Sequence, residues 1–428
     1  MRIVVYGLWH LGCVTAACLA RAGHTVAGLE PERHVIDDLR HGDPPLQEPG
    51  LPELIRAGLA NKNLSFYSEA APALAEADIL WVTFDTPVNE HDEADVAAVR
   101  SRLEEVGPFL NPGMLVLVSS QVPVGFTRSL QRDWRDKGLR FAYSPENLRL
   151  GKAIEVFCHP ERVILGVESD CDRTRLIELF SPFCSHLEWM SLESAEMTKH
   201  ALNAFLATSV TFINEVARLC EKVGADAKEV ERGLKSEGRI GPRAYLSPGA
   251  AFAGGTLARD LRFLVRRGRD VHVKTPMLEG VLESNEVQKN WVRERVEQLL
   301  AGIADPVAAV LGLTYKPGTS TLRRSSAIEL CRWLHERGVR VRGYDPAVAT
   351  LPAELSNVLE LAASPLDALN GSHVAVISTE WPVFRNLRAA DVSAQMRHPL
   401  VLDPNHFLAD VLSGDPRVQY FATGKRAA

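Results

Sequence analysis

Residues 1–30 constrain the fold of this chain more than any other stretch. A β-branched run at 2–6 passes directly into Gly7-Leu8-Trp9-His10-Leu11-Gly12, a helical stretch covers 13–22, and an apolar run at 25–29 closes on Glu30. Strand, glycine turn, helix and strand within about 30 residues form a βαβ unit. Such a unit joins parallel strands, so we expect a parallel sheet covered by helices.

The glycine turn predicts a dinucleotide site. In a G-x-G-x-x-G turn the first glycine makes the tight turn, the second lets the backbone approach a pyrophosphate, and the third permits close helix–strand packing. Here Gly7 and Gly12 hold the first and third positions, and Trp9 holds the middle one. The helix N-terminus carries the anion, so we expect the cofactor at Gly7, Trp9, His10, Leu11 and Gly12. The alternative is that Trp9 closes the pocket and the site is vestigial.

Glu30, at the end of the second strand, indicates which dinucleotide binds. A carboxylate there accepts hydrogen bonds from the adenosine ribose 2′-hydroxyl and repels a 2′-phosphate. NAD is therefore expected rather than NADP, and the nearby Arg33 weakens this preference.

The rest of the chain falls into regions of different periodicity. Strand candidates at 79–84, 114–119, 140–143 and 163–167 alternate with helical segments, which predicts an α/β fold with a doubly wound, mostly parallel sheet. Long helical periodicity without internal proline follows at 195–223 and 277–301, and a second Rossmann-like pattern begins with a strand at 307–313. We therefore expect domains at 1–193, 194–302 and 303–428.

Composition excludes several classes of protein. A formal charge of −6 argues against a nucleic-acid binder, and no apolar run reaches the roughly 18–20 residues that span a bilayer. The seven cysteines contain no C-x-x-C pair and give neither a disulfide framework nor a zinc site. The N-terminus enters a strand directly and lacks the pattern of a signal peptide. We expect a cytoplasmic protein without a metal, and without nucleic acid or membrane as a partner.

Short motifs along nearly the whole chain resemble one family. The stretch 248–260, Pro-Gly-Ala-Ala-Phe-Ala-Gly-Gly-Thr-Leu-Ala-Arg-Asp, closely resembles the loop P-G-x-G-F-G-G-S-C-F-P-K-D of the UDP-glucose/GDP-mannose dehydrogenases. Further similar segments, in the family's order, lie at 43–50, 86–87, 120–125, 144–151, 159–162, 196–205, 212–215, 239–241, 245–249, 312–317 and 379–382. The resemblance implies an NAD-dependent oxidoreductase acting on a nucleotide sugar. It also implies an N-terminal NAD domain, a C-terminal nucleotide-sugar domain and a homodimer. The helix at 277–301 fits a dimer interface, and the alternative is that this helix belongs to the internal core.

By resemblance, Lys199 and Asn203 hold and polarise the oxygen at the reacting carbon, helped by Asp260. Residues four apart on a helix face the same side, and a cation and an amide donor suit an oxygen that gains negative charge as hydride leaves. Glu146 matches a glutamate close to the reaction centre. The alternative is that Lys199 and Asn203 are two solvent-exposed residues on one helix without a catalytic role.

The same resemblance supplies the substrate contacts. Tyr245 is placed beside the base, Lys316 and Arg323 lie near the sugar or phosphates, and Arg239 matches a residue that reaches a neighbouring subunit's site. The other expected substrate contacts are Arg149, Gly249, Phe252 and Gly255.

Three departures from the family pattern fall together. Thr256 stands at the position of the nucleophilic cysteine, Leu150 replaces a glutamate, and Gln121 replaces a threonine that helps to arrange a catalytic water. All three belong to the second oxidation and thioester hydrolysis, and a threonine hydroxyl without an adjacent base is a far weaker nucleophile than a thiolate. Gln121, with Thr86, remains an expected cofactor contact. Cys158 is near the substrate loop in sequence but lies in the wrong motif to replace the nucleophile.

Three hypotheses follow. The first is a dehydrogenase that removes a single hydride and yields an aldehyde or a ketone. The second is full oxidation to a uronic acid without a covalent intermediate, through an aldehyde hydrate that is oxidised in place. The third is a catalytically silent paralogue that binds a nucleotide sugar or NAD.

Overall fold

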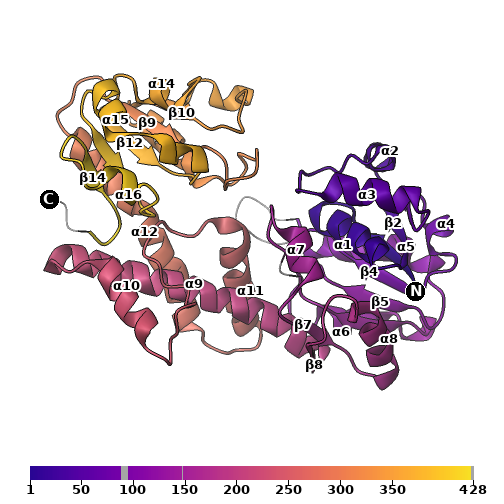
Figure 1. Ribbon diagram of the computed structural model, residues 1–428. Coiled ribbons are helices and arrows are strands. Elements are labelled where there is room, and N and C mark those ends of the chain that lie inside the picture. The colour runs from indigo at the N-terminus through magenta and orange to yellow at the C-terminus, as the bar shows by residue number, and fades with distance from the viewer. Residues whose placement is uncertain (88–94, 147, 426–428) are drawn as a thin grey trace. The chain divides into compact units, whose positions relative to one another are not determined.

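The computed structural model describes residues 1–87, 95–146 and 148–425 (Figure 1). The chain divides into two compact units, Met1–Leu202 and Asn203–Ala428. The long helix α9 (Leu192–Val223) begins in the first unit and continues into the second. Because α9 runs through the boundary expected at residue 193, the three-domain division stays a prediction.

The first unit is built on an eight-stranded sheet in the order β3-β2-β1-β4-β5-β6-β7-β8. Only the β6–β7 pair is antiparallel, so the predicted mostly parallel sheet is confirmed. The strands are β1 Arg2–Tyr6, β2 Thr25–Leu29, β3 Leu64–Tyr67, β4 Ile79–Val82, β5 Leu115–Val118, β6 Arg140–Tyr143, β7 Val163–Gly166 and β8 Leu187–Met190. The helices are α1 His10–Arg21, α2 Arg33–His41, α3 Leu51–Ala60, α4 Ala70–Leu74, α5 Val96–Val106, α6 Phe126–Asp133, α7 Ala153–Cys158 and α8 Asp170–Phe180.

Strand β1 shows why both faces of this sheet are covered. Successive side chains of a strand point to opposite faces. Accordingly Ile3 and Val5 pack into a core with α1, α3, α7 and α8, whereas Val4 and Tyr6 pack into a second core with α4, α5 and α6. A central strand buried on both faces reads as a continuous apolar run, as the sequence shows here.

The second unit contains helices and a six-stranded parallel sheet in the order β11-β10-β9-β12-β13-β14. This repeats the first six positions of the other sheet, so the predicted second Rossmann-like domain is confirmed. The strands are β9 Val307–Leu311, β10 Arg340–Tyr344, β11 Glu360–Leu361, β12 Val374–Ile377, β13 Leu400–Leu402 and β14 Gln419–Phe421. The helices after α9 are α10 Ala227–Ser236, α11 Arg259–Asp270, α12 Pro276–Leu300, α13 Ser326–Glu336, α14 Pro365–Leu369, α15 Ala389–Gln395 and α16 Ala409–Leu412. Over the described residues, no helix has the length and apolar character that a membrane span requires.

Candidate active site

Two glycines shape the turn between β1 and α1. Gly7 has a φ of +102°, in the region that favours glycine. A Cβ on Gly12 would lie 1.9 Å from the Gly7 carbonyl oxygen. A side chain at residue 12 would therefore push α1 away from β1, as expected for the third glycine of a dinucleotide turn.

Trp9, at the middle position, takes φ −90° and ψ −154° and needs no glycine backbone. Its indole is 48% exposed and lines a cavity of about 330 Å³, so it does not fill the cavity. Within the described residues, no hydrogen bond takes the N–H groups of His10, Leu11 and Gly12, and no side chain caps α1. An uncapped helix N-terminus beside a cavity suits a pyrophosphate.

Glu30 lies in the same cavity and is buried. Its Oε2 accepts a hydrogen bond of 3.0 Å from the Leu8 N–H, and its Oε1 lies 3.3 Å from Arg102 Nη1. These contacts hold the carboxylate at the end of β2, where a ribose hydroxyl would meet it. Arg33 is exposed and does not line this cavity.

Thr86 and Gln121 lie side by side, as the cofactor prediction requires. The Thr86 hydroxyl donates a hydrogen bond of 2.6 Å to the Gln121 carbonyl. The two residues follow β4 and β5, at the carboxyl ends of two neighbouring strands, of which β4 is next to β1. Ligands of open α/β sheets bind at this edge, where the strand order reverses.

Glu48 is a site residue whose role the sequence did not reveal. Its buried carboxylate accepts hydrogen bonds of 2.8 Å from the N–H groups of Gly151 and Ala153, and it lies 2.8 Å from His10 Nε2. It therefore joins the first turn of α1 to the loop that carries Arg149. Its place in the Gln-Glu-Pro-Gly motif was a signal, but His10 lies 38 residues away in sequence, and Gly151 and Ala153 lie 103 and 105 residues away.

The second Rossmann-like sheet has a similar glycine turn, but the acidic residue beside it is bound by groups of the protein. Gly312 has φ +87°, and Asp345 at the end of β10 accepts from the N–H groups of Leu313 and Thr314, as Glu30 does from Leu8. Asp345 also accepts a hydrogen bond from the Trp381 indole and is fully buried, and the Ser325 side chain caps α13. Asp345 is thus bound by groups of the protein itself, whereas Glu30 lines an open cavity, so the first sheet is the better fit for the ribose of a dinucleotide.

Lys199 lies on α9 in the first unit. Its Nζ donates a hydrogen bond of 2.6 Å to the main-chain carbonyl of Glu146, in the loop after β6. The structure thus brings together two of the predicted catalytic residues. Arg149, in the same loop, is exposed.

Asn203 and Asp260 form a buried pair in the second unit. The Asn203 Nδ2 donates to Asp260 Oδ2, and the two side chains are 5% and 0% exposed. Thr256 lies one turn before Asp260, on the π-helical turn Gly254–Ala258 that leads into α11. It is exposed, and no acid or base among the described residues is hydrogen-bonded to its hydroxyl.

All seven cysteines are free, and none lies on the Thr256 turn or on α11. Cys158 is buried in the core of the first unit, where it accepts a hydrogen bond from Arg21 of α1. A hydrogen bond from Cys18 and the Arg21 charge lower the pKa of the Cys158 thiol to about 7, although burial opposes this. Cys158 is therefore a buried packing residue between α1 and α7.

The loop before Thr256 is fixed by side-chain amides. Gly249 donates its N–H to Asn214 Oδ1 at 2.9 Å, and its carbonyl accepts from Gln288 Nε2 at 2.8 Å. A Cβ on Gly249 would lie 2.4 Å from Asn405 Oδ1, which instead accepts the Ala250 N–H at 2.7 Å. Gly249 therefore anchors the loop with its own peptide groups. Asn214 belongs to a recognised motif, but Gln288 and Asn405 carried no sequence signal.

Phe252 is held by a reciprocal pair. Its N–H donates to Asn285 Oδ1 at 2.9 Å, and its carbonyl accepts from Asn285 Nδ2 at 3.0 Å. The ring lines a cavity bounded by Ala250–Ala253, α12, the start of α13 and the end of β12, together with the basic side chains Lys289, Arg293 and Arg324. This cavity, within the second unit, has the charge that a nucleotide diphosphate requires.

The remaining predicted substrate residues lie nearer the surface. Arg323 lines a neighbouring cavity of about 680 Å³, and Arg324 lines both cavities. Tyr245 is 59% exposed, and Arg239 is exposed and pairs with Glu237 at 3.0 Å. Lys316 is half-buried, and Gly255 lies on the π-helical turn.

Family models match the chain in the order of its parts. The NAD binding domain of the UDP-glucose/GDP-mannose dehydrogenase family matches residues 1–184, the central domain matches 193–287, and the UDP binding domain matches 309–410. The chain belongs to the UDP-glucose/GDP-mannose dehydrogenase family. The resemblance drawn from the motifs is confirmed, and with it an NAD-dependent oxidoreductase acting on nucleotide sugars.

Relatives match over nearly the full length. The UDP-glucose 6-dehydrogenase of Rhizobium meliloti is 34% identical, with 94% of each chain covered. That of Pseudomonas aeruginosa is 33% identical, with 100% of this chain and 98% of the relative covered. The solved structure of a UDP-glucose dehydrogenase from the hyperthermophilic archaeon Pyrobaculum islandicum has a TM-score of 0.89 at 28% identity, covering 99% of this chain and 98% of that one.

In this member of the family, NAD fits the cavity of the first unit. The close glycine turn, the uncapped α1 N-terminus and the Glu30 carboxylate are the three features it needs. The vestigial alternative is not supported, because Trp9 leaves the cavity open.

Proposed function

We propose that this chain oxidises one hydroxyl-bearing carbon of a nucleotide sugar and stops after a single hydride. The observation that carries the proposal is the turn before α11. It keeps the buried Asn203–Asp260 pair, but it presents a threonine hydroxyl one turn earlier, where a thiol would be needed for a second step.

In this account Lys199 and Asn203 stabilise the substrate oxygen. An amide carries two N–H donors, and one of them is bound to Asp260, so Asp260 orients the amide while the other N–H meets the oxygen. The Lys199 ammonium, steadied by the Glu146 carbonyl, supplies positive charge as the oxygen becomes negative. The hydroxyl proton passes to the Glu146 carboxylate or to an ordered water. NAD, when bound, accepts the hydride.

In this account, Thr256 and Leu150 stand where a second oxidation would need a nucleophile and an acid or base. A thiolate adds to an aldehyde at neutral pH, whereas no acid or base in the described part of the chain is hydrogen-bonded to the Thr256 hydroxyl to take its proton. Leu150 carries no acid or base for hydrating the aldehyde. The aldehyde or ketone is therefore the product.

Full oxidation to a uronic acid is the second candidate. Relatives at 31–34% identity named UDP-glucose 6-dehydrogenase favour it, and they make UDP-hexoses the first substrates to test. The match to a UDP binding domain points to the same base.

We also propose a homodimer, but on α9 in place of the expected helix at 277–301. Phe205, Phe212 and Leu219 recur every seven residues along α9 and are 71%, 49% and 65% exposed. A seven-residue apolar repeat is typical of a helix that packs against a second helix. A second copy of the chain supplies an identical stripe.

Analysis of the product tests the single-step proposal. The purified protein is incubated with NAD and UDP-sugars, the products are trapped with hydroxylamine, and they are identified by mass spectrometry. An oxime of the nucleotide sugar is expected. A nucleotide uronic acid without an oxime would contradict the proposal and favour full oxidation. If the protein binds but does not convert the sugars, the silent-paralogue hypothesis applies.

A further inference from the structure

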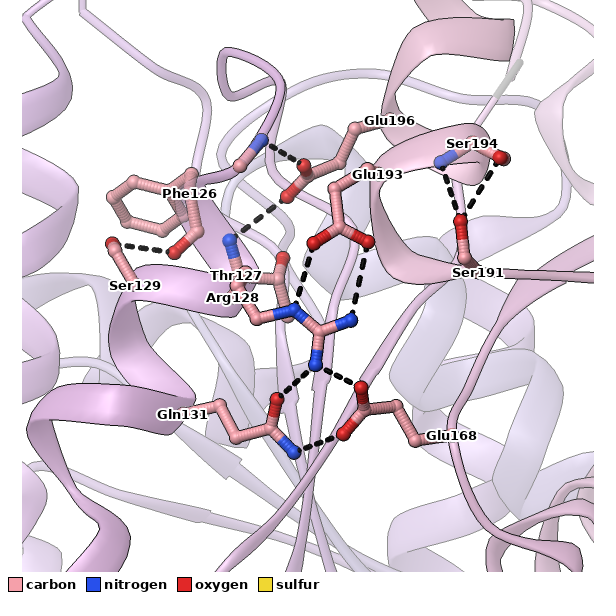
Figure 2. A network of polar contacts seen from close by, with 11 residues as sticks. Phe126, Thr127, Arg128, Ser129, Gln131, Glu168, Ser191, Glu193, Ser194 and Glu196 are labelled. Carbon is pink, nitrogen blue, oxygen red and sulfur yellow. Dashed lines mark hydrogen bonds and ion pairs between the residues drawn. The ribbon is translucent and has the colours of Figure 1, made fainter.

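Side chains near the start of α9 are hydrogen-bonded to loops at the carboxyl ends of strands in the first sheet. The Glu196 side chain is fully buried and accepts hydrogen bonds from two backbone groups, Gly125 N–H at 2.5 Å and Thr127 N–H at 2.9 Å. Figure 2 shows both contacts from the carboxylate of Glu196 to the start of α6. The N-terminus of α6 carries partial positive charge, so a carboxylate is the group that suits this position.

The loop held by Glu196 is the one that carries Gln121. One turn further along α9, His200 Nε2 lies 2.8 Å from the Val122 carbonyl, and Lys199 donates to the Glu146 carbonyl. Glu196, Lys199 and His200 thus share one side of α9 and contact the loops after β5 and β6. The position of the Lys199 ammonium therefore depends on where this side of α9 lies relative to the loops after β5 and β6.

Exposed contacts brace the same pair of helices. Arg128 of α6 bonds to Glu193 of α9 at 2.7 and 3.2 Å, to Gln131 at 2.8 Å and to Glu168 (Figure 2). The Arg128, Glu193 and Glu168 side chains are 32%, 39% and 41% exposed. Ion pairs of this exposure contribute little to stability. The buried Glu196 contacts, by contrast, cannot be replaced by water.

We propose that Glu196 is a positioning residue: its carboxylate seats the start of α9 on the 121–127 loop and so holds the Lys199 ammonium in place for the reaction. This proposal rests on the role given to Lys199 under the proposed function. Burial raises the pKa of Glu196, and the hydrogen bonds from Thr127 and from the Gly125 N–H partly oppose that rise.

Glu196→Gln is the test, because the amide keeps the shape of the side chain. One of its two groups is an NH₂, which faces a backbone N–H and cannot accept from it. The start of α9 then shifts, and displacements of about 1 Å near reacting groups cost on the order of a hundredfold in rate. We expect kcat to fall tenfold or more, with the KM values for NAD and the sugar within about twofold of the wild type.

Glu193→Gln is the matched control. It changes the same kind of residue one turn earlier on α9, but it touches only the exposed network, so kcat should stay within about twofold of the wild type. If Glu196→Gln does not fold, as judged by circular dichroism, His200→Phe removes the neighbouring contact to Val122 and is expected to lower kcat with unchanged KM.

The outcomes separate the two proposals. A wild-type protein that turns over sugars together with a Glu196→Gln variant of unchanged kcat overturns the positioning role and leaves the proposed function intact. Equal losses of kcat in Glu196→Gln and Glu193→Gln also overturn the positioning role, because they indicate a non-specific loss of structure around the start of α9. A wild-type protein without turnover overturns both.

Discussion

We expect Gly12 to matter for cofactor binding because it has no side chain. A Cβ there would lie 1.9 Å from the Gly7 carbonyl oxygen, so Gly12→Ala must move the start of α1 and the N–H groups that face the cavity. We expect the Kd for NADH, measured by fluorescence titration, to rise by at least about tenfold. Gly233→Ala, at a helical glycine with open space around it, should leave the Kd unchanged. Equal Kd values for the two variants would contradict the assignment of this turn.

Lys199 supplies the charge on which the proposed chemistry depends. Removing one donor from a developing oxyanion typically costs about 10²–10³ in kcat, and Lys199→Ala is expected to lose at least that much. Steady-state NADH formation measures it, with Lys274→Ala, at an exposed lysine, as the control. A Lys199→Ala variant with wild-type kcat would show that the ammonium does not act on the reacting oxygen.

At the scale of elements, the loop 249–252 is held by hydrogen-bonded side chains that follow strands of the second sheet. Glu380 accepts a hydrogen bond from Asn405, which in turn accepts the Ala250 N–H. Burial raises the pKa of the Glu380 carboxyl, although the Asn405 contact partly opposes this. The half-buried acid is therefore more protonated in the folded chain than in the unfolded one over part of the acidic range.

The sign of the pH dependence follows from that shift. A carboxyl with a raised pKa in the folded state favours folding most below its unfolded pKa, and it loses this contribution as pH rises through the folded value. The free energy of unfolding of Glu380→Gln, relative to that of the wild type, should therefore increase as the pH rises above the ordinary glutamate pKa of about 4.3. Urea denaturation at each pH measures the difference. Glu354→Gln, at an exposed site, should show none of this trend, and a flat difference for Glu380→Gln would refute the argument.

Elements buried on both faces were predictable from sequence. The runs at 2–6, 25–29 and 140–143 coincide with strands, because a short and almost continuous apolar run is typical of a strand that is buried on both faces. Strands β3, β8 and β14 were not predicted. They lie at sheet edges, are short and only partly buried, and so carry weak patterns.

The residues of the candidate site were also predicted only in part. Glycines, Glu30, Lys199 and Asn203 stand in recognisable motifs, and the structure finds Asn203 beside Asp260 and Thr86 beside Gln121. The residues that position them were largely missed. Glu48, Gln288 and Asn405 act through contacts 39 to 155 residues away, and such contacts depend on the tertiary fold, which a local pattern does not encode.

For the whole molecule, the stripe on α9 predicts assembly. Phe212→Asp places a charge in the middle of the apolar repeat, so a dimer should become a monomer of half the mass by light scattering after size exclusion. Ile177→Asp is the matched control, since Ile177 is equally exposed, at 49%, but lies on α8. A Phe212→Asp protein that remains dimeric would place the interface elsewhere.

The central claim is that this member of the UDP-glucose/GDP-mannose dehydrogenase family removes one hydride per sugar, because Thr256 replaces a thiol. The most direct measurement is the amount of NADH formed per molecule of nucleotide sugar consumed, with NAD in excess and the reaction run to completion. The account predicts a ratio of one. A ratio of two would contradict it, because an acid would then be made without a cysteine at this position.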